Sequence, residues 1–176
     1  MNAVIDVFGH GDEIRIESYS EFHPQAREYR GLAVLRSIRI QPVIEEQAER
    51  LWKESGAASS WTAIHFRGTD HLKCLAASPL ELFASCVMQE LELNPNQKFL
   101  FCTDEHHVAK LFEEKFGIQS PVCVRGRRLP EQQILGVVDW LLLQKCHRIL
   151  GSAGSSFSEL AALRAGNQLY VLTQEQ

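Results

Sequence analysis

The sequence predicts an α/β fold, a three-layer α/β/α Rossmann-like domain with a parallel sheet. Short apolar runs alternate with longer amphipathic segments, which is typical of strands joined by crossover helices. Two of the apolar runs end abruptly in glycine and small polar residues, the composition of a turn after a buried strand. In such a fold, ligands bind where the carboxyl ends of the strands meet.

Length and composition are those of one soluble domain. The chain has 176 residues, 45% of them hydrophobic, and a formal net charge of −4. This charge argues against a broad nucleic-acid surface. The longest apolar run is far shorter than the roughly 20 residues of a membrane span, and the first residues are acidic, unlike a signal peptide. We therefore expect a cytoplasmic protein without a membrane span.

The cysteines and histidines do not indicate a metal site. The five cysteines are odd in number and include no Cys-x-x-Cys pair, so we expect reduced thiols, mostly in the core. His65, His71, His106 and His107 show neither the H-E-x-x-H pattern nor Cys/His spacing. We expect no metal and no cofactor.

The N-terminal region, residues 1–30, differs from the rest. It contains a potential hairpin around Gly9-His10-Gly11-Asp12, followed by a polar stretch without a clear period, and we interpret it as a hairpin or linker. Residues 31–176 are predicted to form the Rossmann-like domain.

Proline and capping residues mark the expected helix starts in this domain. Pro42 opens an amphipathic helix, and Pro130 opens another. Ser78-Pro79-Leu80-Glu81 has the form of a capping box, and either Thr103 or Asp104 can cap the next helix, which Gly117 ends. Between the helices, apolar runs predict strands at 63–66, 99–102, 122–124, 148–150 and 169–172.

The strand at 63–66 leads into the most informative stretch, His65-Phe66-Arg67-Gly68-Thr69-Asp70. Arg67 offers a planar fork of donors suited to phosphate or carboxylate, and His65, two residues earlier on a strand, projects to the same face. The alternative reading is a core histidine beside an ordinary surface ion pair.

A second stretch, Gly151 to Ala161, joins a strand to a helix through small residues. Ser156 and Glu159 have capping-box spacing, and free amides at the helix start favour a phosphate. A plain βα turn is the alternative, since such turns also prefer serine and glycine. The G-x-G-x-x-G and G-x-x-x-x-G-K-[ST] patterns are absent, which disfavours a standard dinucleotide or Walker site.

Two further features have open interpretations. Asp139 lies in an apolar segment, where an unpaired carboxylate is costly, so it needs a partner from the protein or a ligand. Arg125-Gly126-Arg127-Arg128 suits an acidic ligand or a solvated loop. Asp70, Thr103, Asp104 and Ser152 follow strands and mark the possible edge of a site.

These motifs resemble those of the GDP-fucose-dependent fucosyltransferases, which include the protein O-fucosyltransferases and the α1,6-, α1,2- and nodulation enzymes. His65 to Asp70 looks like the H-x-R-x-x-D motif of that family. Residues 35–51 are similar to the lead-in of the motif. Asp139, followed by Ser155-Ser156-Phe157, is similar to the family's third motif, an acid before a Ser/Thr-Phe turn.

The resemblance implies the carboxyl-terminal, GDP-fucose-binding half of a GT-B glycosyltransferase that works without a metal. Arg67 would be catalytic, since it would hold the diphosphate and stabilise charge on departing GDP. His65 would position ribose or phosphate, and Ser155, Ser156 and Phe157 would supply turn amides to the phosphates. Asp139 would accept hydrogen bonds from the guanine edge, and Asp70 would shape the turn.

Two departures from the family pattern leave three function classes open. Some relatives carry a second arginine where this chain has Gly68. A GT-B enzyme also places its acceptor between two domains, whereas this chain has room for one. The first class is a compact fucosyltransferase whose cleft a homo-oligomer would complete. The second is a GDP-sugar-binding module without turnover, and the third is a structural relative with an empty site.

Overall fold

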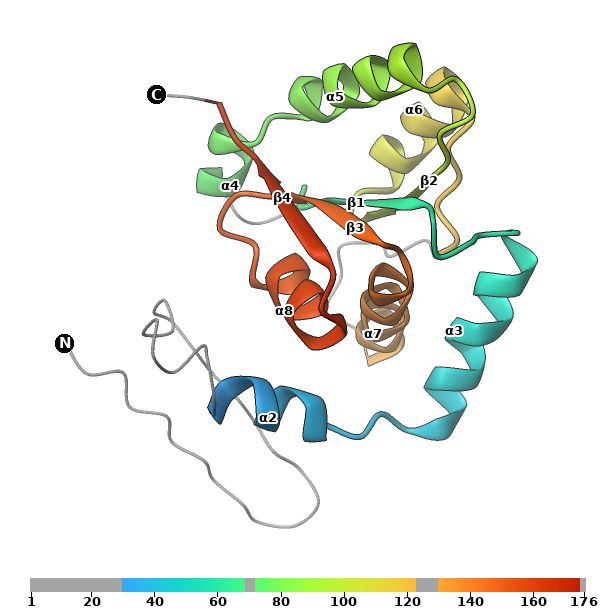
Figure 1. Ribbon diagram of the computed structural model, residues 1–176, viewed down its shortest axis with the longest axis vertical. Coiled ribbons are helices and arrows are strands. Elements are labelled where there is room, and N and C mark those ends of the chain that lie inside the picture. The colour runs from blue at the N-terminus through green and yellow to red at the C-terminus, as the bar shows by residue number, and fades with distance from the viewer. Residues whose placement is uncertain (1–29, 69–71, 123–129, 175–176) are drawn as a thin grey trace, which may run out of the picture. The chain divides into compact units, whose positions relative to one another are not determined.

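The computed structural model describes residues 30–68, 72–122 and 130–174 (Figure 1). Residues 1–38 and 39–176 form two separate units, and each is described by itself. In the first, α2 spans Arg30–Ser37, a helix that the sequence analysis did not predict. The potential hairpin lies outside the described residues, and the boundary expected after residue 30 stays a prediction.

The second unit is built on a four-stranded parallel sheet. Its strands are β1 (Thr62–Phe66), β2 (Phe99–Thr103), β3 (Arg148–Ser152) and β4 (Gln168–Leu172), in the order β2-β1-β3-β4. The α/β fold with a parallel sheet is therefore confirmed. Of the strand expected at 122–124, Val122 is not in a strand, and the other two residues lie outside the described part.

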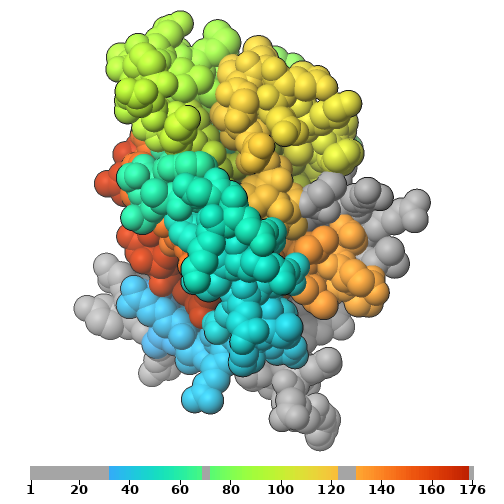
Figure 2. Space-filling model, turned by 90° about the vertical axis from the view of Figure 1, so that its right-hand side faces the viewer, coloured from blue at the N-terminus to red at the C-terminus, as the bar shows by residue number. Residues whose placement is uncertain are grey.

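Helices cover both faces of the sheet. On one face lie α3 (Pro42–Glu54), α7 (Pro130–Lys145) and α8 (Ser156–Ala165), and on the other lie α5 (Leu80–Leu93) and α6 (His106–Phe116). Figures 1 and 2 show α5 and α6 side by side. A short helix, α4 (Leu72–Ala77), was not predicted; Leu75 packs with the α5 and α6 side of the core.

The strand pleat divides the core in two. Every residue of β1 and β2 is buried, which agrees with a strand covered on both faces. Ala63 and Leu100 pack with α3, α7 and α8, whereas Ile64 and Phe101 pack with α5 and α6. Because side chains alternate along a strand, His65 belongs to the same side as Ala63.

The predicted helix caps are wrong in detail. The residues at the N-cap positions of α5, α6 and α8 are Pro79, Glu105 and Ser155, and none of them makes a side-chain capping bond. Ser156 is instead the first helical residue of α8. Ser78 and Asp104 bond to loop amides at the carboxyl edge of the sheet, because those amides have no partner from helix or strand.

Two further expectations from composition concern the cysteines and membrane-spanning helices. Cys74, Cys86, Cys102 and Cys146 form no disulfide, and all but Cys86 are buried, as expected; Cys123 lies outside the described residues. Among the helices that the structure describes, none has the length and apolar character needed to cross a bilayer.

Candidate functional site

The parallel register brings three strand ends together. Phe66 pairs with Thr103 of β2, and His65 pairs with Gly151 of β3. Arg67, Asp104 and Ser152 therefore lie at one edge, the carboxyl edge of the sheet, as the sequence analysis expected for ligand binding in such a fold.

Side chains from the two neighbouring strands hold the end of β1. The backbone N–H of Arg67 donates to Ser152 Oγ at 3.0 Å, and the N–H of Gly68 donates to Asp104 Oδ1 at 2.7 Å. The Ser152 hydroxyl also donates to the His65 carbonyl at 3.4 Å. The positions of two successive residues of the motif are thereby fixed from both sides.

The Arg67 guanidinium is partly exposed and pairs with a carboxylate. Its Nη1 lies 3.5 Å from Asp104 Oδ2, and the two side chains are 34% and 13% exposed. Phosphate oxygens accept from a guanidinium fork at shorter distance, so a bound phosphate would compete with Asp104 for this side chain.

Gly68 has no room for a side chain. A Cβ built there would stand 2.4 Å from Glu105 Cγ and 3.1 Å from Phe66 Cε1. Glu105 fills this space and pairs with His107, whose Nδ1 lies 3.0 Å from Glu105 Oε2. At this position, where some members of the family that the motif resembles carry a second arginine, the chain has a glycine packed against a glutamate.

His65 is a buried, neutral imidazole. Its ring stacks on Phe157 of α8, with centroids 4.7 Å apart. Burial lowers the pKa of His65 to about 4; the Asp104 carboxylate opposes this shift and the Arg67 guanidinium reinforces it. Its Nδ1 has no hydrogen-bond partner among the described residues, and a buried polar atom without a partner costs about 1–3 kcal/mol.

Asp139 on α7 is also buried, with 3% of its surface exposed. Burial raises its pKa well above the usual value, and a hydrogen bond with the Cys102 thiol opposes the shift. Asp139 Oδ1 meets no partner within the described residues. Cys102 is the register neighbour of His65, so both polar groups lie on the same side of the sheet. The sequence left two kinds of partner open for Asp139, a group of the protein or a ligand. Among the described residues, the protein supplies one hydrogen bond, that with the Cys102 thiol.

The turn after β3 presents open amides. Gly154 is in the left-handed region, at φ 68°, and Ser155 is the N-cap of α8. The Ala153 N–H donates to Ser78 Oγ, and the Ser155 N–H donates to Ser152 O at 3.2 Å. In the described part of the chain, the amides of Gly154, Ser156 and Phe157 meet no acceptor. This arrangement suits an anion.

Some residues predicted from the sequence make none of the contacts around Arg67 and the turn after β3 that the structure describes. Thr103 lies at the strand edge, but its Oγ1 accepts from the Glu105 N–H, so its role is local. Asp70 and Arg125 to Arg128 lie outside the described residues. Among the described residues, no group of three or more acidic, His or Cys side chains has the arrangement of a metal site.

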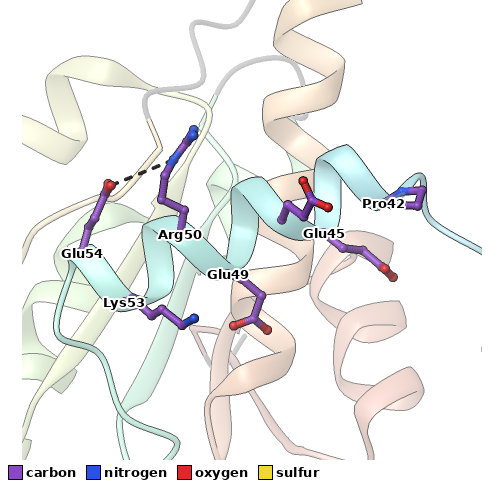
Figure 3. Close-up of a pocket in the computed structure, with 7 residues that line it drawn as sticks. Pro42, Glu45, Glu49, Arg50, Lys53 and Glu54 are labelled. Atoms are coloured by element: carbon purple, nitrogen blue, oxygen red, sulfur yellow. Dashed lines mark ion pairs between the residues drawn. The ribbon is translucent and has the colours of Figure 1, made fainter.

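A surface hollow of about 570 Å³ lies elsewhere, on the outer side of α3 (Figure 3). Its walls include Glu45, Glu49 and Glu54, with Arg50 paired to Glu54 at 4.0 Å. A single exposed helix face with more carboxylates than cations is a poor match for an anionic ligand. The strand edge is therefore the candidate site.

Comparisons with known proteins agree with the fold. No family model matches the sequence, and no curated protein matches it. Solved structures do match. POFUT1 in complex with GDP has a TM-score of 0.53 at 12% identity over 80% of this chain. POFUT1 in complex with GDP-fucose has a TM-score of 0.54 at 12% identity over 82% of it.

A second group of matches is NodZ, a fucosyltransferase from Bradyrhizobium. NodZ α-1,6-fucosyltransferase co-crystallised with GDP has a TM-score of 0.53 at 21% identity over 73% of this chain. The chain spans 49% and 51% of the two POFUT1 chains and 43% of the NodZ chain. The chain therefore has a fucosyltransferase-like fold, matching about half of a POFUT1 or NodZ chain.

Proposed function

We propose that the carboxyl edge of this sheet binds GDP-fucose or a related GDP-sugar through its diphosphate. The observation that carries the proposal is the hydrogen bond from the Arg67 N–H to Ser152 Oγ. This bond joins two segments that lie 85 residues apart in the sequence. It ties the Arg67 backbone to Ser152, which leads into the turn before α8. The Arg67 guanidinium and the open amides of that helix start would together be a metal-free source of positive charge for phosphates.

The remaining residues fit a nucleotide around that diphosphate. We assign Arg67 to the phosphates and to the charge that develops on departing GDP, and the Ser155-Ser156-Phe157 turn to the same phosphates. His65 would position ribose or phosphate through its unpartnered Nδ1. Asp139 would accept from the guanine edge through its unpartnered Oδ1. Each buried atom would gain a hydrogen bond that the described protein does not supply.

The test is a calorimetric titration with GDP, ADP and UDP. Wild type is expected to bind GDP more tightly than the other two, because only guanine donates two N–H groups to one carboxylate. Arg67→Ala is expected to weaken GDP binding about 10- to 100-fold, the loss of a charge-assisted hydrogen bond. Arg50→Ala is the matched control, since Arg50 lies on the outer face of α3. Equal affinity for the three nucleotides would refute the guanine assignment, and equal loss in both variants would refute the role of Arg67.

A GDP-sugar-binding module without turnover is the second candidate function. It is favoured by Gly68, where Glu105 takes the space of a second arginine, and by the match to only about half of each fucosyltransferase. Alignment of an acceptor in a dry cleft contributes up to about 7–11 kcal/mol in well-positioned reactions. The chain matches only about half of a fucosyltransferase, and we assign that half to the donor rather than to this alignment. We therefore expect GDP release from GDP-fucose by the 176-residue chain to be slow.

Release assays with and without candidate acceptors separate the two functions. Rapid, acceptor-dependent release of GDP that Arg67→Ala abolishes would establish a complete enzyme. Slow release that the same substitution leaves unchanged would favour the binding module and deny Arg67 a catalytic role.

A further inference from the structure

Ser78 lies between α4 and α5 and is almost fully buried, with 1% of its surface exposed. The capping-box pattern at Ser78 to Glu81 predicts that this hydroxyl caps α5. In the structure, Pro79 is the N-cap of α5, and no side chain caps that helix. The buried hydroxyl therefore has a different use.

The two hydrogen bonds of this hydroxyl join the turn after β3, residues 153–155, to the last strand. The Ala153 N–H donates to Ser78 Oγ at 2.7 Å, and the Ser78 hydroxyl donates to the Leu172 carbonyl at the end of β4. The backbone around Ser78 is itself anchored. The Ser78 N–H donates to Cys74 O at 2.7 Å, and the Gln174 N–H donates to Ala77 O at 2.8 Å.

The same short segment also packs beneath the turn. Cys74 Sγ lies 3.6 Å from the position that a Cβ on Gly154 would take, which is ordinary van der Waals contact. Gly154 adopts a left-handed conformation, which glycine reaches without steric cost. Residues 74–78 thus contact the turn at two successive positions, Ala153 and Gly154.

We propose that Ser78 is a positioning residue for phosphate binding, one that fixes the 153–155 turn so that its remaining amides face the ligand. This inference rests on the proposed function. By accepting the Ala153 amide, Ser78 sets the peptide plane at the start of the turn. The amides of Gly154, Ser156 and Phe157 are then left for the phosphates. Pre-organised donors bind an anion without the cost of ordering the loop.

A serine suits this position because one hydroxyl both donates and accepts. Ser78→Ala leaves the Ala153 N–H and the Leu172 carbonyl without their partner. Ser78→Thr keeps the hydroxyl and adds one methyl group. Pro79, which follows directly, disfavours helical backbone at residue 78.

The experiment compares GDP with guanosine, which lacks phosphates, for each variant. Ser78→Ala is expected to weaken GDP binding about tenfold and to leave guanosine binding within about twofold. Ser78→Thr is expected to retain the wild-type GDP-to-guanosine affinity ratio. Ser120→Ala is the matched control, because the Ser120 hydroxyl also bonds to a backbone carbonyl, that of Val122, away from the turn. If Ser78→Ala does not fold, Ser78→Cys replaces it, since a thiol donates and accepts only weakly.

The outcomes separate the two proposals. Suppose that wild type binds GDP, and that Ser78→Ala either lowers the affinities for GDP and guanosine equally or changes neither of them. Ser78 is then merely structural, and the proposed function stands. If wild type does not bind GDP, the proposed function is wrong, and the role of Ser78 in phosphate binding is wrong with it.

Discussion

His65 and Asp139 are buried residues whose ionisation is expected to make this protein sensitive to pH. Both lie on the α7 and α8 side of the sheet, and each has one atom without a partner in the described part of the chain. Burial shifts their pKa values in opposite directions, because it disfavours the charged form of each group. The imidazole of His65 is thus neutral near neutral pH, and the carboxyl of Asp139 holds its proton to a higher pH than a solvated carboxyl does.

The His65 side chain is expected to make the fold sensitive to acid. Its pKa is lowered from 6.5 to about 4, so the unfolded chain takes up a proton at a pH where the folded chain does not. The stability that the neutral ring provides is complete above about pH 6.5 and is lost as the pH falls through about 4, up to about 3 kcal/mol in all. Urea unfolding of wild type and His65→Gln at several pH values measures this. The variant should lose less stability on acidification, and parallel pH profiles would contradict the shifted pKa.

Asp139 is expected to couple nucleotide binding to pH. Its folded pKa is raised, so its favourable contribution to folding is present at low pH and is lost as the pH rises above the unfolded value. Guanine recognition by a carboxylate needs the ionised form, so below the raised pKa of Asp139, GDP binding should release a proton and tighten with rising pH. Calorimetry in buffers of different ionisation enthalpy measures that proton. Asp139→Asn should bind GDP more weakly and without proton release; a wild type that releases no proton would refute the role of Asp139.

At the scale of the elements, close packing of α8 on β3 sets the position of the turn that joins them, residues 153–155. A Cβ on Gly151 would stand 2.6 Å from Ser158 Oγ and 3.1 Å from Leu169 Cδ1. Gly136, within α7, has nothing within 4 Å of the same position. Identical substitutions at these two glycines therefore have opposite expected effects.

Gly151→Ala is expected to destabilise the fold by about 1–3 kcal/mol, the cost of overpacking. Gly136→Ala is expected to stabilise it by up to about 1 kcal/mol, because alanine is the better helix former. Urea unfolding of both variants gives the two free energies. If Gly151→Ala were as stable as Gly136→Ala, the tight contact between α8 and β3 would be wrong.

Sequence periodicity predicted most elements, but not their hydrogen bonds. Apolar runs placed β1, β2 and β3 to within one or two residues, because a buried strand needs continuous apolar sequence. The edge strand β4 was placed to within one residue, although most of its residues are exposed. The capping assignments failed for a local reason. Serine and aspartate favour any nearby free amide, and at Ser78 and Asp104 that amide belongs to a distant segment.

At the scale of the whole molecule, strand order assembles the candidate site. The sequence predicted that Arg67, Asp104 and Ser152 would share one sheet edge, since parallel strands end together. It did not predict that β1 lies between β2 and β3, and this order is what gives Arg67 and Gly68 a side-chain partner on each side. The contribution of Glu105 was also missed, because only packing shows that it fills the space beside Gly68.

The central claim is that the phosphates bind where β1, β3 and α8 meet. Its most direct test is a titration of isotopically labelled protein with GDP, followed by amide chemical shifts. The largest shifts are predicted at Arg67, Gly68, Gly154, Ser156 and Phe157, with little change along α3. Shifts confined to α3, around the hollow of Figure 3, or no shifts at all, would contradict the account.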